Sequence, residues 1–147
     1  MLKKTIIGIG SIIGVLASGI AIVDYYNDKS LIDLNGQWII TDTIETGKYK
    51  NTTIGFQVFI TQDGKNFTGE GEKITLNGKN VIQKEKSRLE LVAGTIQSNI
   101  IRATFIEHGR KRETRGEFIW KKIEKKKLSG EFISTANSRG KSIAIKK

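Results

Sequence analysis

The hydrophobic pattern divides the chain into two parts near residue 30. Residues 5–23 form a run of nineteen residues without a charge. A helix of that length spans about 28 Å, close to the ~30 Å thickness of the hydrocarbon core of a bilayer. The residues that follow alternate in short apolar and polar runs. We therefore expect a single-span membrane anchor with a short linker over residues 1–30 and a separate folded domain over residues 31–147.

The domain has the alternation that is typical of β-strands. Ile54, Phe56, Val58 and Ile60 recur with a period of two, as in a strand that buries one face. The same pattern predicts strands over residues 36–44, 54–61, 66–75, 88–97, 99–107, 112–122, 128–136 and 141–146. No segment has the period of an amphipathic helix. We therefore expect an all-β fold, an antiparallel up-and-down β-barrel of about eight strands, with a sandwich as the less favoured alternative.

The apolar segment carries signals of both an anchor and a signal peptide. Gly10 and Gly14 have the small-xxx-small spacing that lets membrane helices pack closely, which predicts a homo-oligomer formed through the anchor. Gly19-Ile20-Ala21 resembles the cleavage site of a signal peptide, which is the alternative to a retained anchor. Lys3 and Lys4 precede the span, and the positive-inside rule then places the domain outside the cytoplasm. The positive charge of the domain itself favours the cytoplasm. The sequence therefore does not decide on which side of the membrane the domain lies.

Composition narrows the chemistry. The chain carries a formal net charge of +10, of which +9 lies on residues 31–147, so we expect an anionic partner such as a nucleotide or a lipid head group. It has no cysteine and one histidine, His108, which excludes thiol catalysis and a multi-histidine metal site. His108 lies beside cations in an expected turn, and we interpret it as a solvated residue. We expect a protein that is not an enzyme and needs no metal or cofactor.

Candidate ligand-binding residues follow from strand parity and side-chain chemistry. Trp38 and Trp120 can stack on a base or pack in the core, and core packing is the more common role. Arg102 shares a strand face with Ile100 and Ile106. If that face lies inside the barrel, the guanidinium needs an anionic partner there, and if it lies outside, its neighbours are incidental. The candidate set is Trp38, Thr41, Tyr49, Arg102, Arg115, Trp120 and Arg139.

The start of the domain resembles the opening strand of the calycin barrels, the lipocalins and avidins. Leu34-Asn35-Gly36-Gln37-Trp38 contains Gly-x-Trp, whose tryptophan closes one end of the barrel in that group. The later stretch Asp63-Gly64-Lys65-Asn66-Phe67-Thr68-Gly69 is similar to the avidin pattern at the next hairpin. The lipocalin Thr-Asp-Tyr motif is not found, and the biotin contacts of the avidins have no counterpart. The resemblance therefore implies a barrel without naming its ligand.

The layout of the whole chain, a short anchor followed by a small basic barrel, resembles the transmembrane β-barrel effectors of bacterial CBASS antiphage signalling. Residues 112–140, in which Gly116-Glu117-Phe118 recurs as Gly130-Glu131-Phe132, are the most similar part. The resemblance implies that the barrel binds a cyclic dinucleotide, that the protein oligomerises and that it disrupts the bacterial inner membrane. That family has two membrane helices, whereas this chain has room for one.

Two other functions stay open on the sequence. One is a membrane-tethered or secreted lipocalin-like carrier of an apolar or amphipathic small molecule. The other is an exclusion or interaction protein without a small ligand. We do not expect direct binding of nucleic acid, because the aromatic residues do not interleave with the cations as they do on stacking platforms for single strands.

Overall fold

Side chains alternate between the interior and the exterior along the strands, as the sequence pattern predicts. A computed structural model of the protein describes residues 32–147. In β1, Gly36–Ile44, the side chains of Trp38, Ile40 and Asp42 are buried, whereas Thr43 is exposed. This alternation turns one face of the sheet inward, and that face supplies the core.

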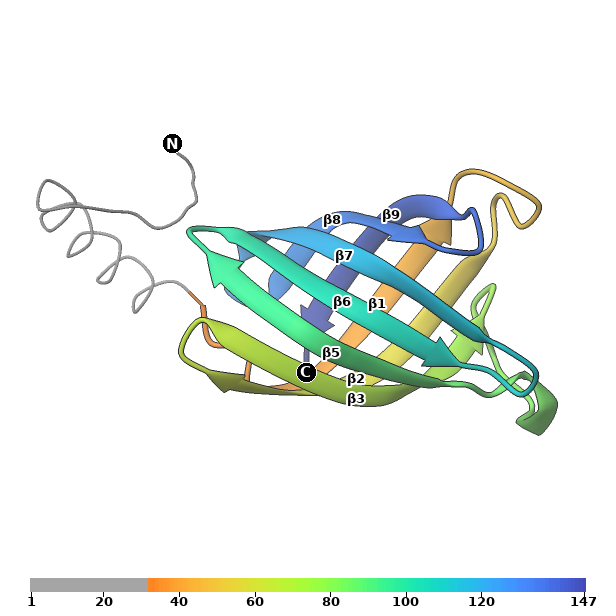
Figure 1. Cartoon of the computed structure of the whole chain (residues 1–147), viewed down its shortest axis with the longest axis horizontal. Helices are drawn as coiled ribbons and strands as arrows, with labels where there is room; N and C mark the ends of the chain where they lie inside the picture. The colour runs from red at the N-terminus through yellow and green to blue at the C-terminus, as the bar shows by residue number, and fades with distance from the viewer. Residues whose placement is uncertain (1–31) are drawn as a thin grey trace, which may run out of the picture. The chain divides into compact units, whose positions relative to one another are not determined.

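The strands form one antiparallel sheet that closes on itself (Figure 1). The elements after β1 are β2 Thr53–Asp63, β3 Asn66–Leu76, β4 Lys79–Asn80, the 3-10 turn η1 Gln83–Glu85, β5 Arg88–Gln97, β6 Ile100–His108, β7 Glu113–Glu124, β8 Lys127–Ser134 and β9 Arg139–Lys146. Neighbours follow the order β2-β1-β9-β8-β7-β6-β5-β3, and β2 also pairs with β3, which closes the barrel. The predicted eight-stranded up-and-down barrel is therefore confirmed, and the sandwich alternative is wrong.

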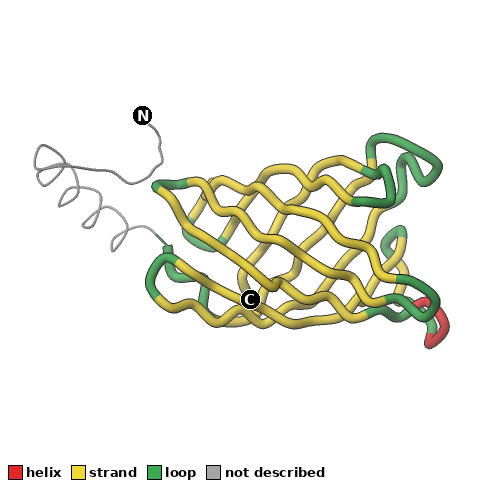
Figure 2. The backbone as a smooth tube through the Cα atoms, in the orientation of Figure 1, coloured by secondary structure: helices red, strands yellow, loops and turns green. Residues whose placement is uncertain are grey.

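The segment between β3 and β5 departs from the expected pattern. Asn77 and Gly78 both have a positive φ, of 52° and 80°, and they turn the chain into the short β4, which pairs only with the end of β3. One turn of 3-10 helix, η1, follows and appears red at one end of the barrel in Figure 2. Neither β4 nor η1 was predicted, because two or three residues are too few to show a period.

The repeated Gly-Glu-Phe sequence reflects close backbone contact between β7 and β8. A Cβ atom on Gly130 would overlap the carbonyl oxygen of Ile119, and one on Gly116 would overlap the carbonyl oxygen of Ile133. Both obstacles are backbone atoms, so a side chain at either glycine would force a strand to move. The two glycines are therefore required by the spacing of the strands.

Aromatic side chains fill much of the core. Trp38 Nε1 donates a hydrogen bond of 2.8 Å to the carbonyl oxygen of Leu34, near the start of β1. Phe118 stacks on Trp120 with ring centroids 4.6 Å apart, and Phe105 lies 4.6 Å from Phe118. The buried apolar core consists of Leu34, Trp38, Ile40, Ile44, Phe56, Val58, Ile60, Phe67, Leu89, Leu91, Ile96, Ile101, Ala103, Phe105, Phe118, Trp120, Leu128, Phe132 and Ala144.

The expected anchor over residues 5–23, the Gly10–Gly14 spacing and the alternative cleavage site lie outside the described residues. Across residues 32–147, none of the helical structure is long and apolar enough to cross a bilayer. The barrel itself forms one compact unit, Ile32–Lys147.

Candidate functional site

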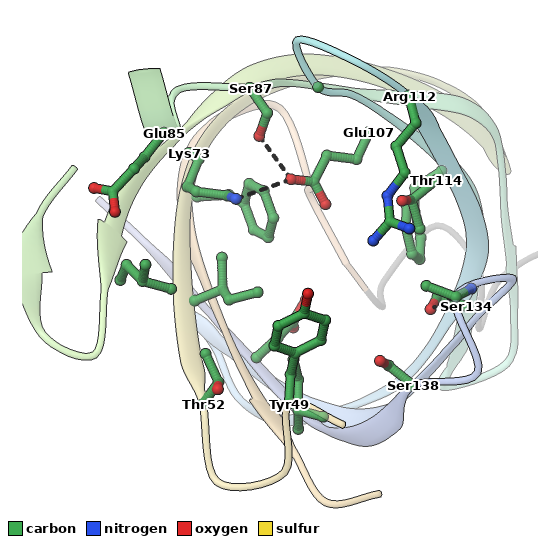
Figure 3. Close-up of a pocket in the computed structure, with 18 of the residues that line it drawn as sticks. Tyr49, Thr52, Lys73, Glu85, Ser87, Glu107, Arg112, Thr114, Ser134 and Ser138 are labelled. Atoms are coloured by element: carbon green, nitrogen blue, oxygen red, sulfur yellow. Dashed lines mark hydrogen bonds and ion pairs between the residues drawn. The ribbon is translucent and has the colours of Figure 1, made fainter. Parts of the chain in front are cut away.

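An open cavity of about 490 Å³ occupies one end of the barrel. The cavity lies where β1 ends and β2 begins, and the hairpins that join β6 to β7 and β8 to β9 border the same opening. In Figure 3, Tyr49, Arg112 and Ser138 stand around this mouth. Small-molecule sites in proteins commonly have volumes of roughly 300–1,000 Å³, so the cavity has the size of a ligand site.

The walls of the cavity are largely apolar. Phe56 on β2, Phe105 on β6 and Phe118 on β7 belong to the barrel core and also line the cavity. The hydrophobic core is therefore continuous with the opening. The apolar lining consists of Ile44, Ile54, Phe56, Leu76, Phe105, Phe118, Phe132 and Ala136. An apolar group of a ligand that reaches these walls leaves water, which favours binding.

Asp42 is a buried acid among these walls. It belongs to the inward face of β1, is 5% exposed and lines the cavity. The desolvation of the carboxyl raises its pKa to about 8, although a hydrogen bond from Ser142 acts in the opposite direction, and the charge of Glu107 adds to the rise. Within residues 32–147, the Oδ1 atom of Asp42 has no hydrogen-bond partner. Trp120 Nε1 in turn donates to Ser142 Oγ over 2.9 Å, which fixes the position of the serine.

A second polar group lies on one side of the cavity. Lys73 Nζ lies 3.2 Å from Glu107 Oε2, and Ser87 Oγ donates to the same oxygen over 2.7 Å (Figure 3). The side chains of Lys73 and Glu107 are only 16% and 18% exposed. Because Glu107 has both a cation and a hydroxyl donor, its charge is compensated within the protein.

The rim of the cavity carries an excess of positive charge. Arg112, in the hairpin between β6 and β7, projects over the opening in Figure 3. Within residues 32–147 its guanidinium forms no ion pair. The charged residues that line the cavity are Lys73, Lys84, Lys86, Arg110, Lys111 and Arg112, against Asp42, Glu85 and Glu107. This charge attracts anions toward an apolar interior.

Three of the sequence-predicted binding residues lie in the β1 region or the core. Tyr49, in the loop between β1 and β2, lines the cavity and is 48% exposed. Trp38 and Trp120 are both 1% exposed and pack in the core, which agrees with the more common role of buried tryptophan. Of these three side chains, Tyr49 alone is available to a ligand, and Trp120 contacts the site indirectly through Ser142.

Arg102 lies on the outer face of β6. Its side chain is 54% exposed and its Nη1 is 3.8 Å from Glu117 Oε1. Of the two orientations that the sequence left open, the structure shows the outward arginine, so Arg102 does not reach the barrel interior. Ile101 and Phe105, which occupy the opposite phase of the same strand, are the residues that face the interior.

The other predicted polar residues also lie away from the cavity. Thr41 occupies the outward phase of β1 between the buried Ile40 and Asp42. Arg115 is exposed, and its Nη2 atom lies 3.2 Å from Glu113 Oε1. Arg139 is exposed at the start of β9. None of Thr41, Arg115 and Arg139 lines the cavity, so the ligand-binding role predicted for them has no support in its geometry.

His108 connects three strands. The sequence suggested a solvated turn residue, but His108 ends β6 and its side chain is 27% exposed. Its Nε2 lies 3.0 Å from Glu90 Oε1, and its Nδ1 lies 3.2 Å from Glu113 Oε2. The interpretation as a solvated residue is therefore wrong. Over residues 32–147, no group of three or more His, Asp or Glu side chains could hold a metal ion.

The buried acids of the cavity, Asp42 and Glu107, were not among the residues predicted from the sequence. Asp42 follows Trp38 and Ile40 at intervals of two, so the parity that placed the tryptophan inside also places the acid inside. Glu107 is likewise in phase with Phe105. Strand parity was thus sufficient to find both acids, whereas the partners Ser87 and Lys73 depend on contacts between distant segments.

The fold and its opening define a closed, antiparallel up-and-down β-barrel with a cavity at one end. No protein-family model matches the sequence, and no curated protein matches it. Among solved structures, a redesigned β-barrel matches with a TM-score of 0.59 and 9% identity over 78% of this chain and 91% of that chain. The redesigned barrel mFAP1, bound to DFHBI, matches with a TM-score of 0.58 and 9% identity over 78% of this chain and 94% of that chain. These similarities show the fold alone.

Proposed function

We propose that this protein binds a small amphipathic anion, with the apolar part of the ligand inside the barrel and the charged group at the rim. The observation that carries the proposal is the combination of an apolar cavity of about 490 Å³ with a rim rich in lysine and arginine. The solved barrel mFAP1, which is bound to DFHBI, supports the use of such a fold for a small ligand. The protein works by binding rather than by catalysis.

The two parts of the site make complementary contributions to the affinity. Contact with Ile44, Ile54 and the phenylalanine walls removes apolar surface from water, at about 25 cal/mol per Å². The charged group stays at the mouth beside Arg112, where it keeps part of its hydration and gains a charge-assisted hydrogen bond. The ligand therefore need not bury an ionised group, which would be costly.

A cyclic dinucleotide is the second candidate ligand. Its support is the exposed Tyr49 ring, on which a base can stack, together with the unpaired Arg112 and the rim lysines, which can contact phosphates. In this version the chain acts as an antiphage effector of the bacterial inner membrane. It is anchored there by residues 5–23, oligomerises through that segment and disrupts the membrane when the ligand binds.

A thermal titration of the full-length protein tests both candidates. Decanoate at about 100 times its dissociation constant stabilises the folded state by about 2.7 kcal/mol, which raises the melting temperature by roughly 10 °C. The uncharged analogue decanol has the same chain without the anion, and we expect it to bind more weakly. A shift with cyclic di-GMP but not with decanoate favours the effector. No shift with either compound would contradict the proposed function.

Matched variants locate the anion. We expect Arg112→Ala to weaken decanoate binding, because the variant removes the unpaired cation at the mouth. Arg139→Ala removes the same charge from an exposed position away from the cavity, and we expect it to bind as the unmodified protein does. Equal losses in both variants would show that the ligand responds only to the overall charge.

A further inference from the structure

A chain of hydrogen bonds from the core ends at Asp42. The indole Nε1–H of Trp120 can only donate, so Ser142 Oγ accepts from it over 2.9 Å. The hydroxyl hydrogen of Ser142 is then directed at the Asp42 carboxyl, with which it forms a hydrogen bond. Since Oδ1 of Asp42 has no partner, the bond from Ser142 is made to the other carboxyl oxygen. Within residues 32–147, the buried Oδ1 is thus the one atom of this hydrogen-bonded series that has no partner.

Among the described residues, no cation is a partner of Oδ1. On β2 and β9, the strands that flank β1, the inward side chains near Asp42 are Ile54, Phe56 and Ser142, none of which titrates. From other elements, the charged residues that line the same cavity are Lys73, Lys84, Glu85, Lys86, Glu107, Arg110, Lys111 and Arg112. Lys73 Nζ forms an ion pair of 3.2 Å with Glu107 Oε2. A carboxyl in this position is therefore favoured in its neutral form, with the hydrogen on Oδ1.

We propose that the Oδ1 hydroxyl of Asp42 recognises the buried end of the ligand by donating a hydrogen bond to an acceptor atom there. The inference rests on the proposed function, because it requires a ligand inside the cavity. It adds the chemical class of that ligand, an amphipathic anion that carries a carbonyl-type oxygen at the end remote from its charge. Without such an acceptor, the polar atom stays unsatisfied in an apolar site, which is unfavourable.

The first test compares two compounds that differ in one group. Decanoate and its analogue with a ketone on the penultimate carbon have the same length and the same anion. Binding to the full-length protein is measured by isothermal titration calorimetry at about pH 6, where the carboxyl is neutral. One hydrogen bond predicts that the ketone analogue binds roughly threefold to tenfold more tightly.

Variants at position 42 test whether the preference for the ketone analogue depends on the donor at this position. Asp42→Asn keeps a donor of nearly the same shape, so we expect the preference for the ketone to remain. Asp42→Leu keeps the branched shape, with a larger volume, and removes the donor, so the preference is lost. Thr43→Val changes the next residue of β1, which is exposed on the outer face, and serves as the matched control. If Asp42→Leu fails to fold, the Asp42→Asn variant still tests the inference through the pH dependence of the preference.

The dependence on pH separates recognition from a structural role. As the pH rises through about 8, Asp42 ionises and its hydroxyl donor disappears, so the preference fades in the unmodified protein. In Asp42→Asn the preference persists across the same range, because an amide does not titrate there. Equal affinity for decanoate and its ketone analogue at about pH 6 would overturn the inference and leave the proposed function standing. Failure of both compounds to bind would overturn the inference together with the carboxylate ligand on which it rests.

Discussion

Lys73 on β3 and Glu107 on β6 form an ion pair of 3.2 Å between two strands that are not neighbours in the sheet. The contact bridges β5, the one strand that separates them, and Ser87, which precedes β5, adds a hydrogen bond of 2.7 Å to the same carboxylate oxygen. The pair neutralises an acid that would otherwise repel an anion entering the mouth. Its position therefore links the stability of the barrel end to the charge of the cavity.

We expect Lys73→Met to destabilise the barrel by about 1–3 kcal/mol, because Glu107 then loses its cation in a largely buried position and has one hydroxyl donor left. The measurement is the free energy of unfolding in urea. Lys86→Met is the matched control, since Lys86 lies 3.8 Å from Glu72 in a pair whose side chains are 47% and 57% exposed. An exposed pair of this kind contributes about 0–1 kcal/mol. Similar losses in the two variants would argue against an interior role for Lys73.

Gly130→Ala tests the close approach of β7 and β8. The added Cβ would overlap the carbonyl oxygen of Ile119, so we expect a loss of several kcal/mol or a failure to fold. Gly64→Ala is the control, because Gly64 has a φ of 64° but no atom within 4 Å of the position of its Cβ. Only conformational strain of about 1 kcal/mol is expected there. A tolerated alanine at position 130 would mean that the strands can separate without cost.

The stability of the protein should fall as the pH rises from about 5 to 8 because of Asp42. Burial raises the pKa of its carboxyl from 3.8 to about 8, so in this range the folded state holds one proton more than the unfolded state. The slope approaches ~1.4 kcal/mol per pH unit for one such group. The Asp42→Asn variant has no carboxyl to titrate at this position. Its free energy of unfolding relative to that of the unmodified protein therefore increases with pH.

Urea unfolding at several pH values measures this slope. The control is Asp33→Asn, since Asp33 is an exposed carboxyl whose pKa is lowered by hydrogen bonds from Asn35, and it titrates below the range. We expect the Asp33→Asn curve to run parallel to that of the unmodified protein. If the Asp42→Asn curve also ran parallel, Asp42 would not be held neutral by the fold.

The positions of the strands can be predicted from the sequence because one face of each strand is buried. The spacing of Trp38, Ile40 and Ile44 at even intervals predicts β1 to the residue, and the same spacing predicts its inward face. Closure of the barrel depends on the pairing of β1 with β9 and of β2 with β3. The hydrophobic pattern favours a closed barrel over a sandwich. The pairing of strands that are distant in the sequence is what shows the closure.

Arg102 is an example of a residue whose orientation the alternation of a strand does not predict. Both phases of β6 contain apolar residues, with Ile101 inside and Ile106 8% exposed on the other side, so the period of two does not distinguish the faces. The cavity residues Arg112 and Tyr49 lie in loops, whose direction no period predicts. The fold was therefore largely predictable, whereas the site needed the packing of segments distant in the sequence.

The measurement that most directly tests ligand binding inside the barrel is a titration of isoleucine-methyl-labelled protein with decanoate, followed by NMR. Ile44 and Ile54 line the cavity, whereas Ile133 and Ile143 are 47% and 37% exposed on the outer face. A ligand in the cavity predicts saturable shift changes at Ile44 and Ile54 with none at Ile133 and Ile143. Changes confined to the two outer isoleucines, or no saturable change at all, would contradict the account.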